Sequence, residues 1–140
     1  MAKIQLLAVL SMDGCLSDME TEGRWWLRPE SYRMDEVRDK VTLEISPDES
    51  LTTLITEHGK PDDTVRLIEA ARETADFVNA MLRVRVIDEI ILYTVPFIAG
   101  TGIRLFQGNL PISYWKQEEL ISFQDGTMRS IYRWREVEED

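Results

Sequence analysis

Cysteine and histidine are almost absent from this sequence of 140 residues, and their scarcity excludes several classes of function. The single Cys15 cannot form an internal disulfide, which agrees with a reducing compartment. One cysteine and one histidine cannot supply a typical zinc site, so we predict no metal centre. A catalytic triad would have to use His58, which precedes Gly59 where a helix is expected to end, so we interpret it as structural.

Long hydrophobic runs and an excess of basic charge are also missing. The longest apolar runs, Ile4–Leu10 and Ile90–Gly100, are shorter than the roughly 18 residues that a membrane helix needs, and the first residues lack a secretory signal pattern. Sixteen basic against 26 acidic residues give a net charge of −10, which disfavours nucleic acid and membranes as partners. We expect residues 1–140 to form a single cytoplasmic domain with a solvated acidic surface.

Hydrophobic patterning predicts an α/β fold with a mixed sheet. A nearly continuous apolar run predicts a buried strand over Lys3–Ser11. The Ile- and Val-rich run Val86–Val95 predicts a second long strand. Near the C-terminus, Asp125-Gly126 lies between two alternating segments and predicts an antiparallel hairpin. Strands therefore alternate with helices early in the chain and pair antiparallel late.

The middle of the chain has weaker signals. A proline at a first helical position predicts a helix over Pro29–Arg38, and alternating β-branched residues predict a strand over Val41–Ile45. The tetrapeptide Ser46–Glu49 has the cap, the proline and the acid of a helix start. The segment Thr64–Arg83 remains open, because its apolar spacing slightly favours one long helix but also fits a strand followed by a helix.

Three segments carry motifs in an informative order. Ala8–Gly14 ends in a Ser-Met-Asp-Gly turn, and Val86–Phe106 contains V-I-D-E-I-I-L-Y, then a proline, then G-T-G-I-R-L-F. Asp125–Tyr132 begins with Asp-Gly and leads to a tyrosine. Together these segments resemble the dihydrofolate-reductase-like fold, and within it the reductase domain of riboflavin biosynthesis. The second segment is the most specific of the three.

The resemblance implies three layers, with helices around a mixed, mostly parallel sheet that ends in an antiparallel hairpin. It also implies NADPH as the cofactor and a small pterin- or pyrimidine-like heterocycle as the substrate. The reaction would be hydride transfer, in which the cofactor performs the chemistry while the protein orients it and excludes water. The loop Met12–Trp26 would cover the site as a lid.

The same resemblance assigns residues to the substrate. Asp13 would be the catalytic residue, orienting the substrate ring or helping to deliver a proton, with a pKa tuned by burial. The residues that would line the substrate site are Gly14, Trp26, Glu30, Gly100 and Gly102.

The cofactor half departs from the family pattern. Glu69, Ala70 and Ala71 occupy the place of a Glu-Gly-Gly motif, whose glycines let main-chain amides approach the cofactor phosphates. Alanine favours a helix and blocks that approach, although the resemblance itself favours a strand followed by a helix over Thr64–Arg83. The family's G-R-x-T segment after the first helix has no counterpart, and the chain is short for the family.

Two functions therefore remain open at this stage. One is an NADPH-dependent reductase of a small heterocycle. The other is a reductase-like binding or dimerisation domain that has lost its cofactor site. Because missing strands would expose an edge of the sheet, we also expect a homodimer.

Overall fold

The strand β1 (Lys3–Ser11) forms the centre of the sheet in a computed structural model that describes residues 3–16, 32–58 and 63–135. Eight of its nine residues are buried, and it pairs in parallel with a strand on each side. A central strand covered on both faces has no side on which polar residues are favourable, which explains its continuous apolar run. The prediction of a buried strand here is confirmed.

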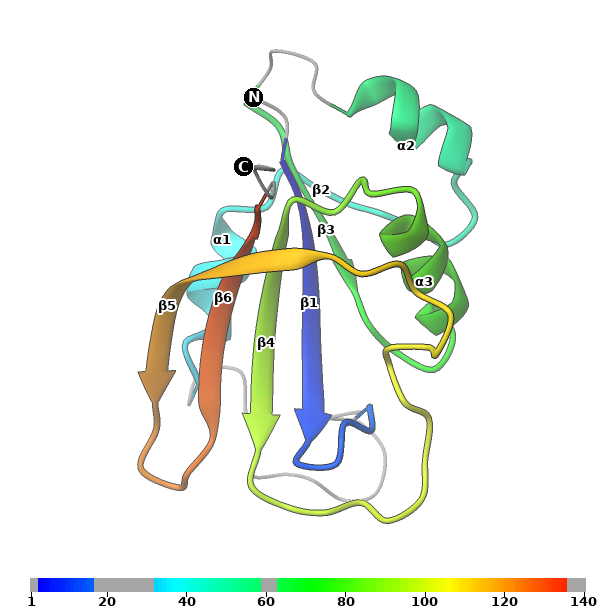
Figure 1. The fold of residues 1–140 in the computed structure, drawn as a ribbon. Coiled ribbons are helices and arrows are strands. Elements are labelled where there is room, and N and C mark those ends of the chain that lie inside the picture. Colours follow the sequence, from blue (N-terminus) through cyan, green and yellow to red (C-terminus); the bar gives the residue numbers. More distant parts are fainter. Residues whose placement is uncertain (1–2, 17–31, 59–62, 136–140) are drawn as a thin grey trace, which may run out of the picture.

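Among the described residues, six strands form one sheet in the order β2-β3-β1-β4-β6-β5 (Figure 1). The pairs among β1 to β4 are parallel, whereas β6 is antiparallel to both β4 and β5. The mostly parallel sheet with a C-terminal antiparallel hairpin is the fold class predicted above. The strands other than β1 are β2 (Leu43–Glu44), β3 (Val65–Glu69), β4 (Glu89–Val95), β5 (Tyr114–Ser122) and β6 (Met128–Arg135).

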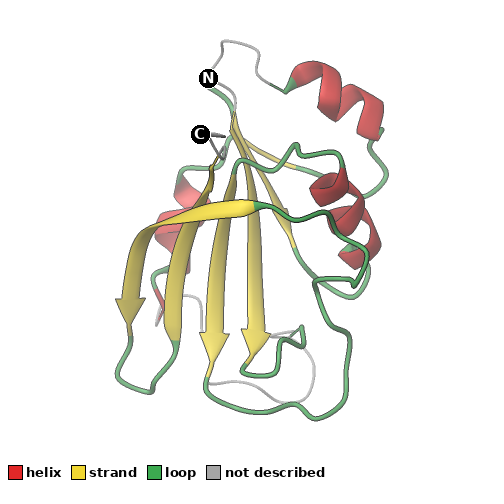
Figure 2. Ribbon diagram, viewed as in Figure 1, coloured by secondary structure: helices red, strands yellow, loops and turns green. Residues whose placement is uncertain are grey.

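Helices cover both faces of the sheet, which gives three layers (Figure 2). The helix α1 (Met34–Asp39) packs on one face. The helices α2 (Leu51–Glu57) and α3 (Ala75–Arg83) pack on the other. No helix in the described ranges is long and apolar enough to cross a membrane.

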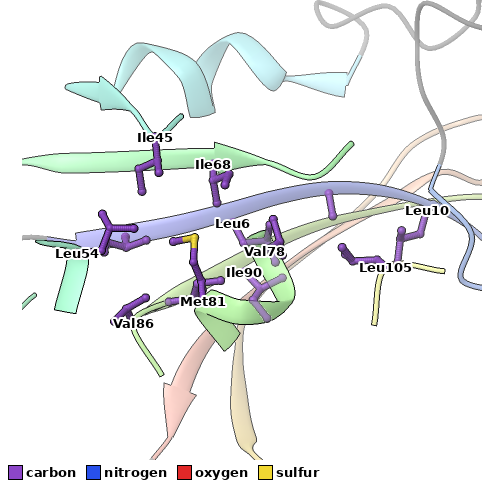
Figure 3. Close-up of a cluster of buried hydrophobic side chains, with 13 residues drawn as sticks. Leu6, Leu10, Ile45, Leu54, Ile68, Val78, Met81, Val86, Ile90 and Leu105 are labelled. Atoms are coloured by element: carbon purple, nitrogen blue, oxygen red, sulfur yellow. The ribbon is translucent and has the colours of Figure 1, made fainter. Parts of the chain in front are cut away.

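Two hydrophobic cores are built from alternate residues of β1, because successive side chains of a strand point to opposite faces. Leu7 and Val9 lie in the core under α1. Leu6 lies in the other core, where Val78 and Met81 of α3 approach it (Figure 3). The sheet is thus held between two apolar layers, and its strand ends are free to carry polar groups.

The segment Thr64–Arg83 contains a strand and a helix. Because β3 pairs with both β1 and β2, and α3 begins only at Ala75, the single long helix is wrong. Main-chain hydrogen bonds on both edges of β3 stabilise the extended conformation. That pairing depends on distant segments, so local apolar spacing does not reveal it.

The helix predicted from Ser46 begins later, at Leu51, with Ser50 as its cap. The carboxylate of Glu49 does accept a hydrogen bond from the main-chain N–H of Ser46, at 2.8 Å. The Glu49 N–H in turn donates to the Ser46 carbonyl, at 3.0 Å. The predicted capping contacts therefore form, but they stabilise a separate turn, residues 46–49, that precedes the helix.

Two other elements are shorter than predicted. The strand predicted over Val41–Ile45 is the two-residue β2, although main-chain hydrogen bonds from Thr42 and Ile45 to β3 flank it. The helix predicted over Pro29–Arg38 corresponds to α1, which ends at Asp39. The start of that prediction, including Pro29, lies outside the described residues.

Candidate ligand site at the carboxyl edge of the sheet

The parallel strands β1, β3 and β4 end at the same edge of the sheet. In open α/β sheets this edge is where ligands usually bind. The predicted site residues that the structure describes follow directly after these strands or in the loop behind β4. They are Asp13, Gly14, Glu69, Ala70, Ala71, Gly100 and Gly102. The last residue of β3 pairs with Leu7 of β1, whereas the last residue of β4 pairs with Ser11, four residues further along β1. The site therefore has two separate parts.

The first part is a junction between the loops after β1 and β4, built around Asp13. One carboxylate oxygen of Asp13 accepts a hydrogen bond from the Ala99 N–H at 3.1 Å, and the other accepts one from the Gly100 N–H at 3.0 Å. The Ser11 hydroxyl also donates to this carboxylate. Asp13 therefore fastens the loop after β4 to the end of the central strand.

These contacts lower the pKa of Asp13 from its ordinary 3.8 to about 2, with the Ser11 hydroxyl as the largest cause and the two loop amides next. Burial acts in the opposite direction and is outweighed. The carboxylate is thus ionised at neutral pH, which is the opposite of what a proton donor needs. Burial therefore does not set the pKa of Asp13, and a part for this residue in delivering a proton stays a prediction. The geometry makes Asp13 a positioning residue, and its contact with a substrate stays a prediction.

The glycines at this junction allow the chain to fold back on itself. Gly14 has a φ of +82°, in the left-handed region that other residues adopt at a cost. After this turn, Leu16 donates a main-chain hydrogen bond to the Ile103 carbonyl at 2.8 Å. A Cβ at Gly102 would lie 3.6 Å from the side chain of Cys15, so the two loops pack directly. The structure thus brings Asp13, Gly14, Gly100 and Gly102 into one unit.

The second part is the turn between β3 and α3. The Ala70 N–H donates to the Leu7 carbonyl at 2.8 Å. The Ala71 N–H donates to the hydroxyl oxygen of Thr74 at 2.8 Å, and that hydroxyl donates to the Glu69 carbonyl at 2.7 Å. Both amides that the family resemblance assigns to cofactor phosphates are therefore used within the chain.

Charges of both signs lie at this turn, where the exposed Arg72 stands between Glu69 and Asp76 in the sequence. The carboxylate of Glu69 is exposed and forms an ion pair with Arg38 at 2.7 Å. The charge of Arg38 is therefore already paired with a carboxylate. Asp76 lies in the first turn of α3, where its negative charge opposes an incoming anion. The Ala70 and Ala71 amides of this turn are thus occupied by hydrogen bonds within the chain and are not free for a phosphate.

Sequence reasoning missed two members of the site. Ser11, which donates to the Asp13 carboxylate, belongs to the Ser-Met-Asp-Gly motif but was not predicted as a site residue. Thr74, which closes the Ala71 amide, was treated as part of an ambiguous helix. The sequence does hold a local signal for each of these residues. Ser11 places a hydroxyl two residues before Asp13, and Thr74 places one three residues after Ala71. Trp26 and Glu30, and most of the predicted lid Met12–Trp26, lie outside the described residues.

Three solved structures share this architecture. A putative riboflavin biosynthesis protein from Shewanella sp. PV-4 has 14% sequence identity and a TM-score of 0.61, over 96% of this chain and 99% of that one. Dihydrofolate reductase from Enterococcus faecalis, complexed with NADP(H), has 9% identity and a TM-score of 0.63, over 96% and 97%. A diaminohydroxyphosphoribosylaminopyrimidine deaminase/5-amino-6-(5-phosphoribosylamino)uracil reductase from Thermotoga maritima has 12% identity and a TM-score of 0.64, over 96% and 57%. The chain has the dihydrofolate-reductase-like fold.

No family model and no curated protein matches the sequence. The likeness extends over nearly all of the Shewanella and Enterococcus proteins, whereas the chain spans little more than half of the Thermotoga protein. The dihydrofolate-reductase-like fold is thus matched over 96% of this chain and nearly all of two of these proteins. The shortening expected in its cofactor half stays a prediction.

Proposed function

We propose that this chain is a reductase-like domain that binds a small flat heterocycle at the carboxyl edge but no longer holds dinucleotide phosphates at the β3–α3 turn. The observation that carries this proposal is the hydrogen bond from the Ala71 N–H to the Thr74 hydroxyl. It fills the position that a phosphate oxygen would need. The Asp13 junction keeps the loops at the substrate end in place.

A second candidate is an NADPH-dependent reductase of a pterin- or pyrimidine-like heterocycle. It is favoured by the names of the structural neighbours, one a uracil reductase and another a dihydrofolate reductase complexed with NADP(H). In this case the dinucleotide would have to bind without the Ala70 and Ala71 amides. The two candidates therefore differ in whether NADPH binds at all.

NADPH titrated into the full chain, followed by calorimetry, is expected to show no saturable binding up to millimolar concentrations. A variant combining Ala70→Gly, Ala71→Gly and Thr74→Val is expected to gain measurable affinity, because it frees the Ala71 amide and removes two methyl groups. Thr56→Val is the matched control, since it also removes a hydroxyl that bonds within the chain, at an exposed place on α2. Micromolar binding by the unaltered chain would establish the second candidate instead.

Heterocycle binding can be followed separately by NMR, with 6-methylpterin and 5,6-diaminouracil as probes. Saturable shifts of the Ala99 and Gly100 amides are expected, because both are held at the substrate end by Asp13. The amide of Val84, which donates to the Ala80 carbonyl at the end of α3, serves as an internal reference. If the shifts of the Ala99 and Gly100 amides do not saturate with either probe, the proposal that the chain binds a heterocycle is contradicted.

We also propose that the chain forms a homodimer through β5, the long edge strand of the described sheet. Tyr114 and Leu120 are about half exposed on this strand, and an uncovered edge favours pairing with another chain. Light scattering is expected to give the mass of a dimer, and Leu120→Lys to shift it toward a monomer. Ile55→Lys, an equally drastic change at an exposed position on α2, should leave the mass unchanged. A monomer for the unaltered chain would contradict the proposal.

A further inference from the structure

The loop behind β4 is long, and residues 96–113 connect β4 to β5 without a helix or strand of their own. Loops of more than roughly 12–15 residues are uncommon in compact domains unless they have a function. This loop first passes the Asp13 junction at the carboxyl edge and then runs beside α3 (Figure 1). Its contacts with α3 are separate from those with Asp13.

Three polar residues on one face of α3 bind this loop. Asp76, Asn79 and Arg83 are three or four positions apart, so their side chains lie on the same side of the helix. The Arg83 guanidinium donates to the side-chain oxygens of Gln107 at 2.8 Å and of Asn109 at 2.6 Å. The side-chain nitrogen of Gln107 donates to the Asp76 carboxylate at 3.0 Å. We call Asp76, Asn79 and Arg83 the polar face of α3.

Asn79, at the centre of this face, is completely buried, yet both polar atoms of its side chain are paired. Its amide nitrogen donates to the Leu105 carbonyl at 2.7 Å and to the Ala75 carbonyl at 2.8 Å. Its oxygen accepts a hydrogen bond from the Gln107 N–H at 3.1 Å. A buried amide is unfavourable unless its hydrogen bonds are made. Because two of the three bonds go to the loop, the asparagine is favourable here only with the loop in place.

The two attachments of the loop lie close together in the chain. Asp13 holds the loop as far as Gly100. Asn79 holds it again from Leu105, whose side chain is also fully buried (Figure 3). Only residues 101–104 separate the two attachments, and fixing one end of so short a segment reduces the conformational entropy that fixing the other end costs. Each attachment therefore favours the other.

We propose that the polar face of α3 positions the substrate end of the candidate site, because this face and Asp13 hold one loop cooperatively. Its residues act through the loop rather than by contact with a ligand, so they are positioning residues. Cooperativity of this kind is reciprocal, and loosening either attachment therefore loosens the other. The effect on ligand affinity rests on the heterocycle site proposed above, whereas the coupling itself can be measured without any ligand.

The substitution Gln107→Met tests this coupling in the ligand-free chain. It keeps the approximate side-chain volume and the main-chain N–H, but it removes the hydrogen bonds with Asp76 and Arg83. Hydrogen exchange at the Ala99 and Gly100 amides, the junction amides, is then expected to accelerate about threefold. This factor corresponds to the lower end of the coupling between residues that share partners.

Gln117→Met is the matched control, since it removes the same side-chain amide from β5, where that amide bonds to Ser130. It is expected to leave exchange at the junction amides unchanged. Asn79→Ala is less informative, because it leaves buried main-chain groups of the loop unpaired and destabilises the fold as a whole. The proposal is overturned if Gln107→Met leaves both junction amides unchanged. It is also overturned if exchange throughout β1 accelerates by the same factor, since the loss of stability is then global.

Further variants test the reciprocity and the role of the hydrogen bonds. Asp13→Ala is expected to accelerate exchange at the Gln107 amide, which Asn79 holds at the other attachment. Asp76→Asn keeps an acceptor oxygen for the Gln107 side chain and is expected to behave like the unaltered chain. Asp76→Ala is expected to give part of the effect of Gln107→Met. An unchanged Gln107 amide in Asp13→Ala would contradict cooperative holding of the loop.

Binding of 6-methylpterin and 5,6-diaminouracil extends the test to the ligand. If the unaltered chain binds either probe, Gln107→Met is expected to weaken binding about threefold and Gln117→Met to leave it unchanged. Equal weakening by both variants would overturn the positioning role. If the unaltered chain binds neither probe, the proposed function fails, whereas the exchange measurements still decide whether α3 positions the loop.

Discussion

Replacing Asp13 with alanine is expected to release the loop behind β4 from the end of β1. The substitution removes the acceptor of the Ala99 and Gly100 amides and of the Ser11 hydroxyl. Hydrogen exchange at these two amides is expected to accelerate by roughly tenfold or more, because hydrogen bonds to an ionised group protect more strongly than neutral ones. Exchange in β1 itself should change little.

The same junction makes a prediction about pH. The pKa of Asp13 is about 2 in the folded chain and 3.8 ordinarily, so its ionised form is favoured by folding. Its stabilising contribution is complete above the ordinary value and is lost as the pH falls toward 2. Protection of the Ala99 and Gly100 amides should follow that window in the unaltered chain and be independent of it in Asp13→Ala. If protection of these amides instead changed near pH 6, a group other than Asp13 would control it.

Replacing Leu6 with alanine is expected to lower the free energy of unfolding by about 2–5 kcal/mol. Leu6 is fully buried in the central strand, and the cavity would open against Val78 and Met81 (Figure 3). Such a loss is a large part of the roughly 5–15 kcal/mol that stabilises a typical domain. Urea denaturation at constant protein concentration measures it.

A matched control separates this effect from shortening a side chain in general. Ile55→Ala also replaces a large aliphatic residue, but Ile55 is 47% exposed on α2. Its expected effect is about 0.5 kcal/mol, the range of ordinary surface substitutions. Equal losses for the two variants would mean that Leu6 does not occupy the centre of the core.

The strands that the sequence predicted best are those whose burial alone fixes their pattern. Lys3–Ser11 is mostly apolar because it is covered on both faces, and Asp125-Gly126 is a turn signal that needs no distant partner. β3 was ambiguous because its conformation depends on pairing with β1 and β2. The helix expected from Ser46 began later because local capping contacts are equally satisfied in a turn.

The candidate site was predictable in position but not in its chemistry. The motif order located Asp13, Gly14 and Gly100 at one edge, and the structure joins them there. The pKa shift of Asp13 has a local cause, the Ser11 hydroxyl, but the two amides that add to it lie more than eighty residues away and could not be predicted from the sequence.

The position of β1 in the sheet also determines when the fold can be completed. Residues 3–11 are synthesised before their strand partners in the sheet, residues 65–69 and 89–95. Contacts between such distant segments form slowly, whereas the β5–β6 hairpin closes locally. During synthesis an apolar strand therefore remains unpaired until most of the chain has emerged, and in that interval it is exposed to aggregation. The acidic surface of the chain, with its net charge of −10, opposes association of such incomplete chains.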